Sequence, residues 1–239
     1  MKLNLRGSPV LILVFFLLIS ITTKAQPVVA LTGSWQSQEG ETKTILLFQD
    51  NYFTQSVFNP SEFVMTFGGP YSVENNTIKI NVEFNSANAE EVGKQLTSNF
   101  SINGNSLQLA LNNKAATLQR TGDGSAPLDG VWQITGRMQD GKVVPINHSG
   151  TRKTLKMLTG GRFQWFAIDP GSKQFSGTGG GTYSFVGGKY TENIELFSRD
   201  NNRVGASLSF DGKLENGDWH HSGLSSAGAS IYEVWGRVK

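Results

Sequence analysis

The sequence predicts an all-β protein made of two tandem, small, antiparallel up-and-down β-barrels. Two observations indicate this fold: one sequence unit is present twice, and each copy contains short runs in which apolar and polar residues alternate. Turn-forming residues separate the runs, and the 239-residue chain has 28 glycines, as expected of short strands joined by tight turns. About eight short strands fit in each unit, enough to close a small barrel.

The repeated unit begins with a Gly-x-Trp sequence, at residues 33–35 and again at residues 130–132. Further matches continue the repeat: Lys43-Thr44 with Lys153-Thr154, Phe53 with Phe163, Asn59-Pro60 with Asp169-Pro170, and Tyr71-Ser72 with Tyr183-Ser184. The second copy is longer after its tryptophan, which predicts an insertion around residues 136–150. The chain therefore divides into a first barrel over residues 30–121, a polar linker over 122–127 and a second barrel over 128–239.

Alternation of apolar and polar residues places individual strands. Residues 78–84 alternate throughout, which predicts one strand with one buried face. Residues 163–168 have apolar side chains on both faces, which predicts either a strand covered on both sides or an exposed aromatic patch. Residues 87–96 are expected to form one or two helical turns. Hairpin turns are predicted at Asn103-Gly104, Gly160-Gly161, Gly187-Gly188 and Asp211-Gly212.

The first 25 residues are typical of a signal peptide. Lys2 and Arg6 precede an apolar run over residues 10–21, which is short for a transmembrane helix. Small residues before Gln26 predict cleavage between Ala25 and Gln26. We therefore expect an exported protein, periplasmic or extracellular, with no stable membrane anchor after cleavage; an uncleaved anchor is the alternative.

Composition excludes several kinds of chemistry. The chain has no cysteine, which excludes disulfides, thiolate metal ligands and a cysteine nucleophile. The formal net charge is +2, with basic and acidic residues interleaved, so nucleic acid is not an expected partner. The sequence has no Gly-x-Ser-x-Gly elbow and no phosphate-binding loop with a Lys-Ser/Thr ending. We expect no enzyme activity and no cofactor.

The Gly-x-Trp start, with an arginine near the end of each unit, resembles the lipocalin-like barrels of the calycin superfamily. The resemblance covers residues 33–239, although its specific part is only these few residues in each unit. In that superfamily the tryptophan closes one end of the barrel and the arginine packs across its ring. The resemblance therefore implies two structural pairs, Trp35 with Arg120 and Trp132 with Arg237. It also implies an interior that is filled or holds one small ligand.

Six side chains in the second unit are candidates for a ligand pocket: Met157, Phe163, Trp165, Tyr183, Tyr190 and Glu192. The simpler interpretation of the apolar members is barrel core, and Tyr183 matches Tyr71 of the first unit, which favours a shared structural role. Glu192 is more informative, because Ile80 is at its position in the first unit. A buried carboxylate is costly unless paired, so we expect Glu192 either to hold a ligand's polar group or to pair with a core Lys or Arg.

Three histidines, His148, His220 and His221, are the remaining candidates. Neighbouring residues on a strand point to opposite faces, so only one of His220 and His221 can face a barrel interior. A zinc site needs three or four ligands, and a surface strand end is the simpler interpretation of this pair. We therefore expect no metal site.

The expected function is binding of a small apolar ligand by an exported, non-catalytic, lipocalin-like protein. The alternative is an envelope interaction or structural module with filled barrels, acting through an exposed face at Phe166 and Ile168. An enzyme working through Glu192 or a histidine is a third hypothesis, without a visible catalytic constellation. The sequence identifies neither the ligand nor a protein partner.

Overall fold

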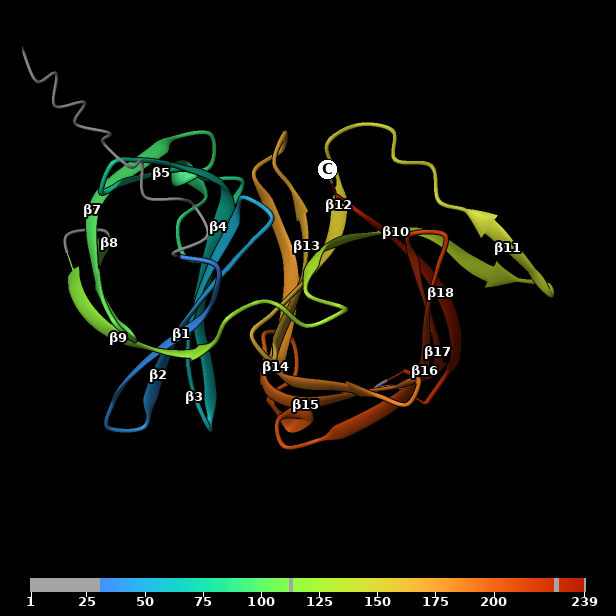
Figure 1. Ribbon diagram of the computed structural model, residues 1–239. Helices are drawn as coiled ribbons and strands as arrows, with labels where there is room; N and C mark the ends of the chain where they lie inside the picture. The colour runs from blue at the N-terminus through green and yellow to red at the C-terminus, as the bar shows by residue number, and fades with distance from the viewer. Residues whose placement is uncertain (1–30, 112–113, 226–227, 239) are drawn as a thin grey trace, which may run out of the picture.

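The computed structural model describes residues 31–111, 114–225 and 228–238. The predicted signal peptide, residues 1–25, lies outside the described residues. Within them the chain forms two closed antiparallel barrels, one from each predicted repeat (Figure 1). No helix in these three segments is long and apolar enough to cross a membrane.

Eight strands close the first barrel. They are β1 (Gly33–Glu39), β2 (Thr42–Gln49), β3 (Tyr52–Asn59), β4 (Glu62–Glu74), β5 (Thr77–Asn81), β7 (Gln95–Asn103), β8 (Ser106–Leu111) and β9 (Lys114–Gly122). Each strand pairs with the next, and β9 returns to pair with β1, so the predicted up-and-down order is confirmed. A short strand, β6 (Phe84–Asn85), pairs with β4 and is followed by a single 3-10 turn, η2 (Ala89–Glu91).

The second barrel repeats this plan. Its strands are β10 (Gly130–Gln139), β12 (Lys153–Thr159), β13 (Arg162–Asp169), β14 (Gln174–Val186), β15 (Lys189–Phe197), β16 (Ser207–Glu215), β17 (Asp218–Leu224) and β18 (Ser230–Arg237), with η3 (Asn201–Arg203) matching η2. Pairing of β10 with β18 closes the ring. The predicted insertion is a hairpin between β10 and the extra strand β11 (Lys142–Pro145), which projects from the barrel in Figure 1.

Both repeats contain the same β-bulge beside the fourth strand. Gly69 in β4 and Gly181 in β14 lie against it, and a Cβ atom at either position would be 1.9 Å from the carbonyl oxygen of Asn81 or Asn193. Only glycine fits this approach without moving the backbone. The repeated glycine therefore marks a bulge that is part of the shared fold.

The bulge reverses the side-chain alternation after it. The prediction of one strand over residues 78–84 is therefore wrong: β5 ends at Asn81, and Phe84 belongs to a different core from Ile80. The matching residue in the second repeat, Leu196, is likewise in a different core from Ile194.

Turn chemistry explains most of the hairpins. Positive φ angles are present at Gly104, Gly160-Gly161 and Gly187-Gly188, as predicted. The turn predicted at Asp211-Gly212 is wrong, because both residues lie within β16. The turn instead falls at Asn216-Gly217, with φ angles of 54° and 89°.

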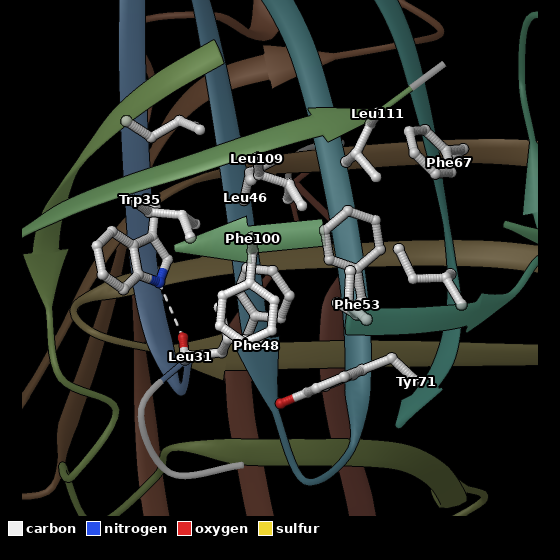
Figure 2. Close-up of a cluster of buried hydrophobic side chains, with 14 residues drawn as sticks. Leu31, Trp35, Leu46, Phe48, Phe53, Phe67, Tyr71, Phe100, Leu109 and Leu111 are labelled. Carbon is white, nitrogen blue, oxygen red and sulfur yellow. Dashed lines mark hydrogen bonds between the residues drawn. The ribbon is translucent and has the colours of Figure 1, made fainter. Parts of the chain in front are cut away.

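Each barrel has its own aromatic interior. Figure 2 shows Trp35, Phe48, Phe53 and Tyr71 gathered inside the first barrel, packed with leucines from several strands. The second interior is formed by the following buried residues: Leu128, Trp132, Ile134, Leu158, Phe163, Tyr183, Tyr190, Ile194, Phe210, Trp219 and Trp235.

A third core lies between the barrels and uses equivalent strands of both repeats. Its matched members are Ile45 with Leu155, Leu47 with Met157, Phe58 with Ile168, and Phe84 with Leu196. Phe166 stacks on Phe84, with ring centres 4.8 Å apart, and lies beside Tyr52 at 5.6 Å. Phe166 and Ile168 are at most 1 % exposed, so β13 is covered on both sides, which is the first of the two alternatives that the sequence left open.

Among the ion pairs that cross this interface, two join a lysine of one repeat to a glutamate of the other at matched positions. Lys43 of the first barrel lies 3.8 Å from Glu195 of the second, and the matching Lys153 of the second lies 2.8 Å from Glu83 of the first. A contact that is repeated with the partners exchanged is the signature of a twofold, isologous interface. The two repeats are therefore packed like the subunits of a symmetric dimer.

Candidate ligand-binding site in the second barrel

The tryptophan of each Gly-x-Trp sequence is buried near the start of the first strand of its barrel. The indole N–H of Trp35 donates a hydrogen bond to the carbonyl of Leu31 at 2.8 Å (Figure 2). The indole of Trp132 donates to the carbonyl of Leu128 at 2.9 Å. Both rings are fully buried, so the indole N–H must have this partner to avoid a desolvation cost.

An arginine from the last strand covers each tryptophan. The guanidinium of Arg120 lies 4.0 Å from the ring centre of Trp35, and that of Arg237 lies 4.5 Å from that of Trp132. Each arginine also donates to the carbonyl oxygen of the residue before the Gly-x-Trp glycine, at 2.5 and 2.8 Å. The structure thus forms both pairs that the family resemblance implies, with a favourable cation–π geometry.

The second barrel contains a cavity of about 270 Å³. Apolar walls come from β13, β15, β16 and β18 and include Trp165, Ile194, Phe197, Leu208 and Ile231. Four ionisable side chains also line it: Lys156, Glu192, His221 and Glu233. Such a mixture of apolar walls and a few converging polar groups is typical of a small-molecule site.

Lys156 and Glu192 form a buried ion pair. The ammonium nitrogen of Lys156 lies 2.7 Å from Oε1 of Glu192, and both side chains are 6 % exposed. The hydroxyl of Tyr190 donates to the same oxygen at 2.8 Å. Glu192 therefore pairs with a core lysine, which is one of the two alternatives that the sequence left open.

An aromatic cage surrounds the same ammonium group. Its nitrogen lies 5.3–5.9 Å from the centres of four rings, those of Phe163, Tyr190, Trp219 and Trp235. Ring faces attract a cation, and the attraction is stronger away from water. The cage and the carboxylate together offset the cost of burying Lys156.

His221 and Glu233 form a looser pair beside the cavity. Nδ1 of His221 lies 3.6 Å from Oε2 of Glu233, which is too long for a hydrogen bond, and both ring nitrogens of His221 are buried without a hydrogen-bond partner. Burial lowers the pKa of His221, and the nearby Glu233 offsets this only in part. His221 is therefore neutral at neutral pH.

The carboxylate of Glu233 is held in its charged form. Its Oε2 accepts a hydrogen bond from the indole N–H of Trp235 at 3.1 Å. Burial raises the pKa of Glu233, but His221, Lys156 and the Trp235 indole outweigh burial, so the pKa lies below its usual value. Glu233 is thus an ionised acceptor in an otherwise largely apolar cavity.

The first barrel has an equivalent cavity of about 320 Å³ with different chemistry. Strand registers align Lys156 with Leu46, Glu192 with Ile80, His221 with Leu109, and Glu233 with Ala116. All four ionisable positions of the second barrel are therefore apolar in the first. Buried ionisable groups are costly, so their presence in one repeat alone indicates a role that the shared fold does not require.

The structure brings two of the six predicted ligand-site residues to the cavity, Trp165 and Glu192. Phe163, Tyr183 and Tyr190 are in the interior core, outside the residues that line the cavity. The Tyr183 hydroxyl donates a hydrogen bond to the carboxylate of Asp129, which places Tyr183 next to the Gly-x-Trp sequence.

Met157 does not face the interior of the second barrel. It belongs to the core between the barrels, and its sulfur lies 4.0 Å from the hydroxyl of Thr54 in the first barrel. Adjacent residues of β12 alternate between the two cores, so Lys156 points inward where Met157 points outward.

Lys156 and Glu233 are site residues that the sequence did not predict, and His221 is buried in the cavity wall although a surface position was favoured for the His220-His221 pair. The signal was nevertheless present, because comparison with Leu46 at the matching position separates Lys156 from the shared core, as Ile80 does for Glu192. The other two histidines have their own partners: His148 contacts the carbonyl of Ile134 at 2.6 Å and His220 the hydroxyl of Tyr232 at 2.9 Å. Among the described residues, no group of three or more His, Cys, Asp or Glu residues could hold a metal ion.

No protein-family model matches the chain, and no curated protein matches it either. The fold and site define a class of protein: two closed, eight-stranded antiparallel barrels in tandem, each with a tryptophan–arginine pair. This architecture is compatible with a lipocalin-like fold.

Proposed function

We propose that the protein is an exported, non-catalytic, lipocalin-like (calycin-type) binding protein that holds a small molecule in the cavity of its second barrel. One observation carries the proposal: Lys156, Glu192, His221 and Glu233 line this cavity, while the matching positions of the first barrel are apolar. Evolution of a binding site in one copy of a duplicated barrel accounts for this difference.

The size of the cavity and the pairing of its charges support binding rather than catalysis. A volume of about 270 Å³ is at the lower end of ligand pockets, which usually measure about 300–1,000 Å³. Glu192 is already engaged by Lys156 and Tyr190, so it is poorly placed to abstract a proton from a substrate. The ligand is therefore small, with an apolar part against Trp165 and Phe197.

The alternative function, an envelope interaction module, was based on an exposed face at Phe166 and Ile168. Phe166 and Ile168 are buried between the two barrels and offer no exposed aromatic face. Both barrels also contain cavities, whereas that hypothesis assumes filled interiors.

Native mass spectrometry of the protein purified from its own host tests the proposal. We expect a bound mass that is lost in Leu208→Trp, which fills the second cavity, and retained in Val57→Trp, which fills the first. Both positions are half-buried and apolar, so the two variants are matched. Absence of any bound mass, or its loss only in Val57→Trp, would contradict the proposal. N-terminal sequencing tests export, with Gln26 as the expected first residue.

A further inference from the structure

The charges in the second cavity do not balance. Lys156 contributes one positive charge, Glu192 and Glu233 contribute two negative charges, and His221 is neutral at neutral pH. One negative charge remains. The lining includes no other ionisable side chain among the described residues.

The unbalanced charge belongs to Glu233. Lys156 and Glu192 neutralise each other at 2.7 Å, and both side chains are almost completely buried. Among the described residues, the only basic side chain within ion-pair distance of Glu233 is His221, which is neutral at neutral pH. The side chain of Glu233 is 23 % exposed, the most accessible of the four.

His221 provides an independent indication of a ligand. Its side chain is 2 % exposed and lines the cavity, yet neither ring nitrogen has a hydrogen-bond partner. A buried polar atom without a partner is costly, and native proteins contain few of them. The neutral imidazole has one nitrogen that accepts a hydrogen bond, so a ligand N–H group would satisfy it.

We propose that the second cavity binds a small organic cation, an amine with a compact apolar body, whose ammonium group pairs with Glu233 and donates to a ring nitrogen of His221. Its apolar body would pack against the aromatic pair Trp165 and Phe197, whose ring centres lie 5.6 Å apart. This inference rests on the proposed function and adds the chemical class of the ligand.

The same contacts disfavour an anionic or a purely apolar ligand. Lys156, the only cation among the described residues of the lining, already has a carboxylate and four aromatic rings around it. An anion would therefore face the uncompensated charge of Glu233. A purely apolar ligand would leave Glu233 desolvated and His221 without a partner, and both have a cost.

Calorimetric titration with three probes of similar shape tests the inference: 2-phenylethylamine, its neutral analogue 2-phenylethanol, and the anion phenylacetate. We expect the amine to bind most tightly at neutral pH. Glu233→Gln keeps the shape and an acceptor for Trp235 but removes the charge, and it should weaken amine binding about tenfold or more. Glu215→Gln, a carboxylate on the outside of the same barrel, should leave the affinity unchanged.

Three results would overturn the inference. Phenylacetate or 2-phenylethanol could bind as tightly as the amine, or Glu233→Gln could bind the amine as well as the parent does. Either result leaves the proposed function intact and rejects only the cationic ligand. If none of the probes binds, the inference fails, and the proposed function fails with it only if native mass spectrometry also finds no bound mass.

Discussion

At the residue scale, the buried Lys156–Glu192 pair is the feature with the largest energetic consequence. Moving both charges out of water is expensive, and their 2.7 Å contact, the Tyr190 hydroxyl and the aromatic cage offset this cost. Leu46 and Ile80 in the first barrel show that the fold accepts aliphatic side chains at these positions. The pair is therefore a property of the site rather than a requirement of the barrel.

Removal of one partner should be far more damaging than removal of both. Lys156→Leu leaves Glu192 buried without a cation, and we expect it to lower the free energy of unfolding by about 3–5 kcal/mol. The double variant Lys156→Leu/Glu192→Ile carries the residues of the first barrel and should be as stable as the parent or more so. Urea denaturation measures both values.

Lys213→Leu is the control for this comparison. Lys213 pairs with Glu215 in solvent, so its loss should leave the unfolding midpoint unchanged. If Lys156→Leu were as stable as the parent protein, the ion pair would not be contributing in the way its geometry implies.

Residue-level prediction from the sequence succeeded where the two repeats could be compared. Glu192 stood out because Ile80 is its counterpart, and the need of a buried carboxylate for a partner follows from solvation alone. Glu233 was missed, although the alignment of Arg237 with Arg120 places it at the position of Ala116. Because neighbouring residues of a strand point to opposite faces, the sequence predicted that only one of His220 and His221 can face inward, but not which one.

At the scale of single elements, the bulge at Gly69 and Gly181 determines which side chains reach each core. It allows Ile194 to face the interior of the second barrel while Leu196 joins the core between the barrels. The local backbone geometry therefore sets the composition of one cavity wall.

Gly181→Ala should disrupt this wall. The added Cβ would lie 1.9 Å from the carbonyl oxygen of Asn193, so the two strands must separate. We expect a loss of about 2 kcal/mol or more in the free energy of unfolding, measured by thermal denaturation. Ser184→Ala, at an exposed position of the same strand, should change the stability little. Equal stability of the two variants would contradict a structural role for the bulge.

The alternation of apolar and polar residues predicted the number and order of the strands. It did not predict, for every strand, which side chains face the barrel interior. A single extra residue exchanges the two faces of a strand, so Phe84 was placed on the wrong side; its match Leu196 shows the same exchange. The Asp211-Gly212 turn failed for a related reason. Gly212 lies close to the Phe185 and Trp219 rings inside a continuous strand, a packing role that turn propensity does not anticipate.

At the scale of the whole molecule, the two barrels pack against each other, and we expect them to unfold as one cooperative unit. The shared core between them includes eleven buried residues, and ion pairs exchanged between matched positions surround it. The sequence predicted the duplication, but it could not predict that the copies pack together. An apolar outer face on β13 is equally compatible with an exposed patch.

Phe166→Ala should weaken this coupling. Phe166 stacks on Phe84 of the other barrel and is fully buried, so its truncation should cost about 3–5 kcal/mol. In differential scanning calorimetry we expect one transition for the parent protein and two for this variant. Leu214→Ala, at a position that is 43 % exposed, should keep the single transition. Two transitions in the parent would show that the barrels unfold independently.

Alternate side chains of strand β12 belong to two different cores, and this restricts how the sequence of the strand can change in evolution. Leu155 and Met157 are in the core between the barrels, whereas Lys156 lines the ligand cavity and Leu158 packs in the interior of the second barrel. Insertion or deletion of a single residue in β12 would turn Lys156 toward the core between the barrels and Met157 toward the interior of the second barrel. Both the core and the ligand cavity would be disrupted by this one change. Substitutions at the inward positions alone can therefore alter ligand preference, while the length of the strand must stay fixed.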